Sequence, residues 1–189
     1  MRFPAILGLA ALVWPLPVVG AQTSMPSDRQ VPLILKVLTY DRQFEAKAGA
    51  EVNIGIVYSP ADAASSKTTT EISGTLNKFS GKTVKRLPIN YWTIEYVSPA
   101  RLEEVIKDKG INVIYVSPGN ESNLESILKL SHARDITTTT GVAEYVRKGV
   151  AVGIGSRQGK PQILINLAAS KSEGSEFDAS LLRIATVIQ

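Results

Sequence analysis

Two hydrophobic periods alternate along most of this chain, and this alternation constrains its fold more than any other feature. Apolar residues recur at every second position over residues 52–58, which is the period of a β-strand. Apolar residues at helical spacing follow as far as Phe79. Thr68 and Glu71 have the spacing of a capping box, and Gly81 stands where a helix would end. The pattern therefore predicts a strand followed by a helix.

Further strand-helix units follow in series. A second strand is expected in residues 83–87 or in residues 91–97, because Pro88 interrupts any single long strand. The later units are a helix that begins at Ser98 and Pro99 and ends at Gly110, a strand at 111–116, a helix around 124–128, a strand at 136–140 and a short helix at 142–149. Such a series predicts an α/β fold, a mostly parallel sheet of about six strands with helices on both faces.

The C-terminal part of the chain has a different pattern. Residues 150–154 and 163–167 alternate on either side of a turn at 158–161, which predicts an antiparallel hairpin. Beyond the hairpin, Asp178 is an N-cap candidate for a closing amphipathic helix that packs on the sheet. The expected apolar stripe of that helix is Phe177, Leu181, Ile184, Ala185 and Ile188, with Phe177 against Leu182 as a hydrophobic staple.

Residues 1–21 are expected to be a cleavable secretory signal peptide. Arg2 forms a short basic region, residues 3–19 are apolar, and small residues suit cleavage after Ala21. A transmembrane anchor is the alternative, but this apolar stretch is short for a bilayer core and contains three prolines. We expect residues 22–189 to form one α/β domain that is exported and is not an integral membrane protein.

Cysteine is absent and histidine occurs once, which excludes disulfides, thiolate nucleophiles, iron-sulfur clusters and Cys/His zinc sites. Exported small folds often add disulfides, so this one must rely on its core alone. The first predicted helix offers a suitable apolar stripe, formed by Val31, Ile34, Leu35 and Leu38. Pro32 is tolerated there only if the helix begins close before it.

Two apparent nucleotide-binding motifs fail on their context. Residues 81–83 resemble the tail of a phosphate-binding loop, but the glycine required five positions earlier is Leu76, and the segment runs from helix to strand. Residues 153–155 resemble a dinucleotide fingerprint, but the next expected glycine is Gln158 and no helix follows. We therefore expect no cofactor.

The charged residues do not indicate catalysis or nucleic-acid binding either. His132 lies at the end of a helix, where a cation suits the helix dipole. Glu103 and Glu104 are adjacent, so they point about 100 degrees apart on their helix and fit a solvated face. The formal net charge of +4 is mild and evenly spread, so nucleic acid is not an expected partner. The sequence predicts no catalytic residue and no metal ligand.

Hydroxyl and amide side chains follow several predicted strands and are the one chemically suggestive set. In an open parallel sheet, ligands bind outside the carboxyl ends of the strands. A small ligand crevice could form there from Ser59, Ser117, Asn120, Thr139 and Thr140. The alternative is that these side chains simply cap the helices that follow, which is the commoner role.

The C-terminal third of the chain resembles the YfiR-like periplasmic family. The resemblance lies in residues 144–154, residues 159–169 and residues 177–185: a glycine-bearing strand, a Gly-Lys turn, an Ile-Asn pair and a closing Ser-Leu-Leu helix. The matching structural residues are Gly149, Gly153, Asn166, Leu181 and Leu182. Asn166 is expected to hydrogen-bond to main-chain groups and orient the last helix. Earlier in the chain, the order of elements is compatible with this family.

The resemblance implies a periplasmic, non-enzymatic regulator. Such proteins bind the periplasmic part of a membrane diguanylate cyclase and keep it inactive, which lowers cyclic di-GMP and biofilm formation. This chain departs from relatives with redox control, because it has no cysteine pair, and Gly149-Val150 replaces a double glycine. Trp92 and Tyr145 are the aromatics to test first on a partner-binding surface.

A second hypothesis remains beside the regulator. The chain could be a periplasmic module that binds a small ligand in the strand-end crevice. Ligand-binding proteins for transport usually have two lobes and more residues, so the length of this chain favours the regulator. The sequence leaves the identity of the partner open, and likewise whether the chain forms a homodimer.

Overall fold

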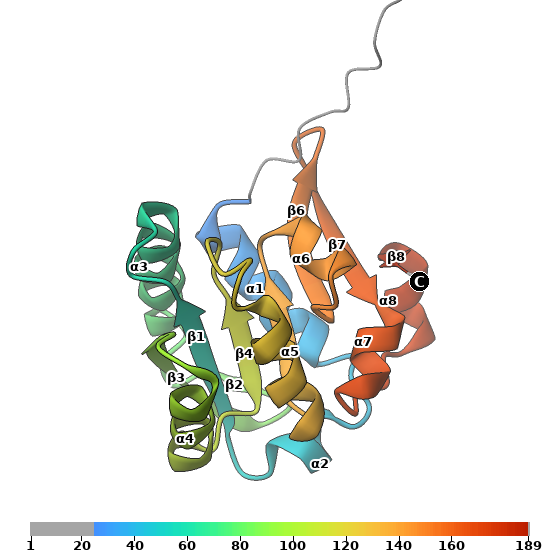
Figure 1. Cartoon of the computed structure of the whole chain (residues 1–189). Coiled ribbons are helices and arrows are strands. Elements are labelled where there is room, and N and C mark those ends of the chain that lie inside the picture. Colours follow the sequence, from blue (N-terminus) through green and yellow to red (C-terminus); the bar gives the residue numbers. More distant parts are fainter. Residues whose placement is uncertain (1–24, 189) are drawn as a thin grey trace, which may run out of the picture.

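A computed structural model describes residues 25–188, so the expected signal segment lies outside the described residues. In these residues all the strands join one sheet, with helices packed around it (Figure 1). The strands are β1 (Val52–Tyr58), β2 (Thr83–Val84), β3 (Leu87–Glu95), β4 (Val113–Val116), β5 (Thr137–Thr140), β6 (Val152–Arg157), β7 (Lys160–Asn166) and β8 (Thr186–Ile188). The helices are α1 (Ser27–Leu38), α2 (Phe44–Ala48), α3 (Ala63–Asn77), α4 (Pro99–Lys109), α5 (Leu124–Ala133), α6 (Ala143–Arg147), α7 (Leu167–Ser172) and α8 (Ala179–Ile184).

The sheet is mostly parallel, as the strand-helix alternation predicts. Its strand order is β2-β3-β1-β4-β5-β6-β7-β8. Among residues 25–188, two neighbouring strand pairs are antiparallel, the β2–β3 pair and the predicted β6–β7 hairpin. The two residues of the hairpin turn, Gln158 and Gly159, both have positive φ, which matches the twist of the flanking strands. The predicted fold class is therefore confirmed.

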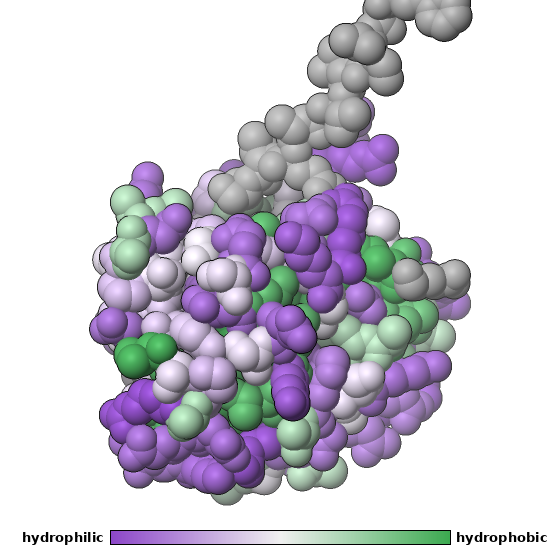
Figure 2. Space-filling model, viewed as in Figure 1, coloured by the Kyte–Doolittle hydropathy of each residue, from purple (hydrophilic) through white to green (hydrophobic). Residues whose placement is uncertain are grey.

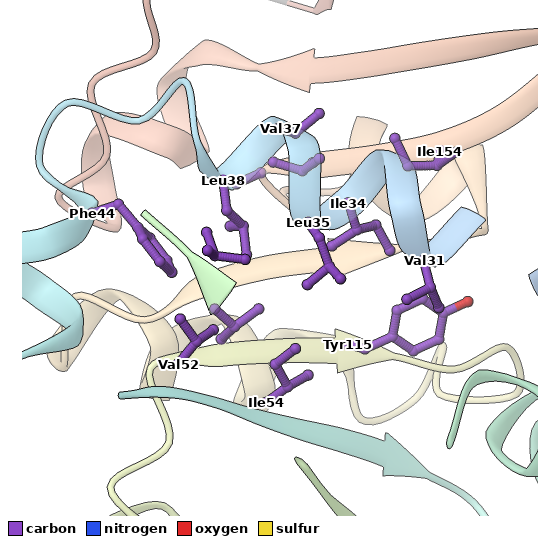
Figure 3. Close-up of a cluster of buried hydrophobic side chains, with 14 of the residues drawn as sticks. Val31, Ile34, Leu35, Val37, Leu38, Phe44, Val52, Ile54, Tyr115 and Ile154 are labelled. Carbon is purple, nitrogen blue, oxygen red and sulfur yellow. The ribbon is translucent and has the colours of Figure 1, made fainter. Parts of the chain in front are cut away.

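One face of the sheet is covered by α1 and α3. The predicted stripe on α1 is buried, and Figure 3 shows it lying over β1, β4 and β6 together with Phe44 from α2. Tyr115 of β4 closes the cluster, and its hydroxyl donates to Gln30 Oε1 at 2.5 Å. Burial raises the pKa of this phenol. Helix α1 is thus fixed by apolar burial and by one buried hydrogen bond.

The opposite face carries α4, α5 and α6. Its core includes Leu102 and Ile106 of α4, Ile127 of α5 and Tyr145 of α6. The predicted ends of α4 are confirmed: Ser98 accepts from the main-chain N–H of Arg101, and the left-handed Gly110 closes the helix. Because both faces are covered, each central strand is buried on both sides.

Three details of the prediction are wrong at the start and middle of the chain. Helix α3 begins well before Thr68, because the carboxylate of Asp62 accepts from the N–H of Ser65 at 2.6 Å and caps it there. It ends at Asn77, before Gly81. Strand β3 runs through Pro88, because pairing with β1 starts only at Ile89 and the missing N–H costs no bond to that strand.

The closing helix is shorter than the sequence predicts. Helix α8 ends at Ile184, and the β-branched residues that follow form β8, which pairs in parallel with β7. Ile184 is 69% exposed instead of lying on the buried stripe. Leu181 is 1% exposed and is the residue that anchors α8 in the core.

Candidate functional site

The carboxyl edge of the sheet has a topological switch point between β1 and β4. The chain passes from β1 outward to β3 and then returns to the other side of β1 to form β4. Ligand sites of open α/β sheets form at such points. Ser59 follows β1 and Ser117 follows β4, so two of the five candidate crevice residues lie at the switch point itself.

The side chains at the switch point bond to one another. Ser117 Oγ lies 2.9 Å from Thr69 Oγ1 of α3, and the N–H of Ser59 donates to Ser65 Oγ at 2.9 Å. The amide of Asn120 donates to the Ser117 carbonyl at 3.0 Å. Ser117 and Asn120 are both fully buried. These groups therefore hold the two loops against α3.

The two threonines of β5 are also used internally. Thr139 Oγ1 donates to the Ile114 carbonyl at 3.2 Å, and Thr140 Oγ1 donates to the Val116 carbonyl at 2.8 Å. Thr140 Oγ1 also accepts from the N–H of Val142 at the start of the next segment. The structure brings the five candidate residues to one edge, but four of them have hydroxyl or amide groups engaged in hydrogen bonds within the fold.

Two polar side chains pack closely against the loops at this edge of the sheet. A Cβ added at Gly119 would lie 2.5 Å from the carboxyl carbon of Asp62, and one added at Gly141 would lie 2.6 Å from Nε2 of Gln30. Both distances are too short for real atoms, so these glycines let the two polar side chains pack directly on the loops. Asp62 and Gln30 thus occupy the edge themselves.

The residues that carry the family resemblance have structural positions. A Cβ at Gly153 would meet Val146 of α6 at 2.4 Å, and Gly149 has a φ of 117° after that helix. Asn166 donates to the Val146 carbonyl at 2.8 Å and accepts from the N–H of Ala169. The expected main-chain bonds of Asn166 are present, but they cap α7 instead of orienting the last helix.

Leu182 and Tyr145 differ from their expected environments. Leu182 is only half-buried, whereas its neighbour Leu181 packs in the core. Tyr145 is 1% exposed, and its hydroxyl accepts from the N–H of Asn120 at 2.9 Å, so it is not a surface aromatic. Trp92 on β3 is half-buried and keeps an exposed part.

A buried charged cluster that no sequence pattern predicts lies at the opposite edge of the sheet. Glu173 lies far along the sequence from Asp41 and Lys47, and Asp41 and Glu173 are 0% exposed. Lys47 Nζ donates to Ser175 Oγ at 2.6 Å and to Thr137 Oγ1 at 2.8 Å, and it lies 3.6 Å from Asp41 Oδ2. Only tertiary packing brings these three residues together.

Glu173 links the C-terminal segment to β5. Its carboxylate accepts from the N–H and hydroxyl of Thr138, at 2.8 Å and 2.6 Å, and from Ser131 Oγ of α5. Burial raises the pKa of this carboxyl group to about 7, against the effect of those donors and of the Lys47 cation. Burial likewise lowers the pKa of the Lys47 ammonium.

A shallow groove of about 580 Å³ lies beside this cluster. Its lining includes Lys47, Lys107, Arg134 and Asp135. Lys107 and Arg134 both pair with Glu103 outside the groove. Lys47 donates its hydrogen bonds to Thr137 and Ser175 within the cluster. The groove therefore offers few free polar groups to a ligand.

Two further observations bear on the kinds of site that the described residues can form. Among residues 25–188, no group of three or more His, Cys, Asp or Glu side chains is placed to hold a metal ion. Over the same range, none of the helices combines the length and the apolar character needed to cross a membrane. Figure 2 shows one face of the molecule, on which apolar residues form separate small patches among hydrophilic ones.

Comparison with known protein families gives one match. The family model described as YfiR/HmsC-like matches residues 31–186, from within α1 to the first residue of β8. Among curated proteins, no sequence matches this chain.

Solved structures with a similar fold include two at 17% sequence identity. A conserved domain protein from Vibrio cholerae matches with a TM-score of 0.60 over 87% of this chain and 60% of its own. The ABC domain in complex with L-Trp from Streptococcus pneumoniae matches with a TM-score of 0.58 over 86% of this chain and 60% of its own. At this identity the likeness concerns the fold alone.

A substrate-binding protein with adhesive properties from Clostridium difficile, in a ligand-free, open structure, is a third match. It has 14% identity and a TM-score of 0.51 over 78% of this chain and 57% of its own. The present chain therefore spans less than two thirds of each of these three proteins.

Proposed function

Because this chain belongs to the YfiR/HmsC-like family, we propose that it is a periplasmic, non-enzymatic regulator that binds and restrains a membrane signalling protein. The partner that we propose is the periplasmic part of a membrane diguanylate cyclase. The observation that carries the proposal is the family match, which extends over nearly all the described residues.

The chemistry of the described residues supports a binding role over a catalytic one. The hydroxyl and amide groups at the switch point bond to the fold, and Asp62 and Gln30 pack over them. In the buried cluster, the carboxylate of Glu173 accepts hydrogen bonds from Thr138 and Ser131, so it is engaged within the fold. A regulator that acts through its surface needs none of these groups to be free.

Export is part of this proposal. Residues 1–21 would direct the chain to the periplasm, and residues 22–189 would act there as one unit. N-terminal sequencing of the protein recovered from the periplasm is expected to begin at Gln22. A protein that still begins with Met1, or that is found only in the cytoplasm, would contradict both export and the regulatory role.

The regulatory role is tested by deletion of the gene. Cellular cyclic di-GMP is expected to rise in the deletion strain and to return when the exported chain is restored. A version that lacks residues 1–21 is the matched control, because it has the same domain without export, and it is expected not to restore the level. Crosslinking in intact cells, followed by purification, is expected to capture a membrane protein. An unchanged cyclic di-GMP concentration in the deletion strain, together with no captured membrane protein, would contradict the proposal.

A second candidate is a small-ligand binding module at Ser59, Ser117, Asn120, Thr139 and Thr140. The observation that favours it is a fold similar to that of two other proteins. One was solved in complex with L-Trp, and the other is described as a substrate-binding protein. The internal hydrogen bonds of these residues weigh against it. Titration with L-tryptophan tests it: a rise in melting temperature that is lost in Asn120→Ala would support this module, and an unchanged melting temperature would count against L-tryptophan as its ligand.

A further inference from the structure

Strand β3 has an open edge over most of its length. On one side it pairs with β1 from Ile89 to Glu95. On the other side β2 pairs only with Leu87 and Pro88. Over residues 25–188, no further strand pairs with residues 89–95 on that second side. The opposite edge of the sheet is closed by β8, which has only three residues.

The main chain of this edge carries unpaired hydrogen-bonding groups. The N–H of Tyr96 donates to the Tyr58 carbonyl at 2.9 Å, which shows that even-numbered residues here direct their main chain toward β1. Ile89, Tyr91, Thr93 and Glu95 therefore direct theirs outward. The register of the β2–β3 pair places Lys82 opposite Ile89, so the open part of the edge starts after that residue. In the described part of the chain, the outward groups of Tyr91, Thr93 and Glu95 have no hydrogen-bond partner. A straight edge of this kind is a template for another strand.

We propose that the β3 edge pairs antiparallel with the β3 edge of a second copy of this chain, so that one sheet runs through a symmetric dimer. Strand β2 and the preceding Lys82 block the edge as far as Ile89, which limits the register. The two-fold register that is centred on residue 92 sets Asn90 opposite Ile94 and Tyr91 opposite Thr93 of the second copy. It also puts Trp92 opposite the second copy's Trp92, on the symmetry axis.

The side chains along the edge complement their own copies in this register. Trp92 is half-buried beside the core under α4, and a second Trp92 directly opposite would cover the part that is now exposed. Charge also changes sign along the edge. Lys82 and Arg86 lie near its start and Glu95 at its end, so antiparallel pairing brings each Glu95 toward the other copy's basic end. A strand from a different protein would need to reproduce both features.

The first test is self-association of the chain that starts at Gln22. One strand pair buries little surface, so we expect a weak dimer that forms between about 1 μM and about 200 μM protein in sedimentation velocity. Trp14 lies in the expected signal segment, so Trp92 is the one tryptophan of residues 22–189. Its fluorescence is expected to shift to shorter wavelength over the same concentrations. A monomer throughout the range, with unchanged emission, would overturn the proposal.

The second test fixes the register by crosslinking. The chain has no cysteine, so single cysteines report without background. Trp92→Cys places two thiols at a non-hydrogen-bonded pair, where a disulfide between antiparallel strands fits, and oxidation is expected to give a covalent dimer. Thr93→Cys is the matched control, because it faces Tyr91 of the second copy and is expected to stay monomeric. Crosslinking of Thr93→Cys as fast as of Trp92→Cys would overturn this register.

The third test removes an outward N–H without touching the core. Thr93 is exposed, so Thr93→Pro is expected to leave circular dichroism unchanged while it weakens dimerisation at least tenfold. Thr93→Val keeps the N–H and is expected to dimerise like the unaltered chain. Equal association of the proline and valine variants would show that the β3 edge is not the contact.

Discussion

At the scale of single residues, Glu173 stores an electrostatic cost inside the fold. Its folded-state pKa is about 7, above the ordinary value of 4.5, so the folded protein binds a proton more readily than the unfolded chain. The contribution of this group is therefore most favourable at low pH and is lost as pH rises from about 4.5 through about 7. Glu173 thus makes stability depend on pH in the physiological range.

Glu173→Gln tests this dependence. A neutral amide can still accept from the Thr138 N–H and, because both hydroxyls can rotate, donate to Thr138 or Ser131. Between pH 5 and pH 8 the free energy of unfolding of the variant should rise relative to the unaltered protein by on the order of 2 kcal/mol. Urea titrations at both pH values measure this. The exposed Glu125→Gln is the control, and a pH-independent difference for Glu173→Gln would contradict the role given to burial.

Lys47 and Asp41 should behave as a coupled pair. Lys47→Met leaves the fully buried carboxylate of Asp41 without its cation, which should lower the free energy of unfolding by about 3 kcal/mol. Asp41→Asn keeps the acceptor for the N–H groups of Gln43 and Glu176, so it relieves that unpaired charge. We expect the double variant to lose less stability than the sum of the two single variants, as measured by urea unfolding. Strict additivity would show that the two charges do not interact.

The candidate site divides into a part that the sequence could predict and a part that it could not. The order of strands places Ser59, Ser117 and the threonines of β5 at one edge, because parallel strands end on the same side. Their bonding partners come from other segments: Thr69 lies far from Ser117 in sequence, and so does Tyr145 from Asn120. The cluster of Asp41, Lys47 and Glu173 has no local pattern, because its members meet only after the chain has folded.

At the scale of elements, periodicity identifies those that are long enough to show a period. Helix α4 has N-cap, proline and C-cap signals that agree with one another, and its ends are correct. Strands β2 and β8 have two and three residues, which is too short for an alternating pattern. The predicted start of α3 is wrong because Thr68 and Glu71 have capping-box spacing by chance inside a helix that Asp62 caps.

The C-terminal helix provides a test at this scale. Leu181 is 1% exposed within the core, whereas Ile184 is 69% exposed on the same short helix. Leu181→Ala should therefore lower the free energy of unfolding by about 3 kcal/mol, because it leaves a cavity under α8. Ile184→Ala is the matched control and should change it by less than about 0.5 kcal/mol. Similar losses for both, measured by urea unfolding, would mean that α8 is not docked through Leu181.

At the scale of the whole molecule, the sheet has a stable centre and weaker margins. Strands β4 and β5 are buried on both faces, and the β5 hydroxyls add bonds to β4 carbonyls. The margins are different, because β2 pairs through two residues and β8 through three. Opening of a margin exposes little apolar surface, so it needs much less free energy than global unfolding.

Hydrogen exchange should therefore rank the strands by their place in the sheet. Amides of β4 and β5 are expected to exchange only through global unfolding. Their exchange rates should therefore fall in variants that are more stable and rise in variants that are less stable. Amides of β2 and β8 should exchange faster by several orders of magnitude, and Glu173→Gln should change their rates little. Mass spectrometry of peptides that cover residues 83–84, 113–116, 137–140 and 186–188 measures this ranking. Equal protection of β8 and β4 would mean that the C-terminal strand belongs to the same cooperative unit as the centre of the sheet.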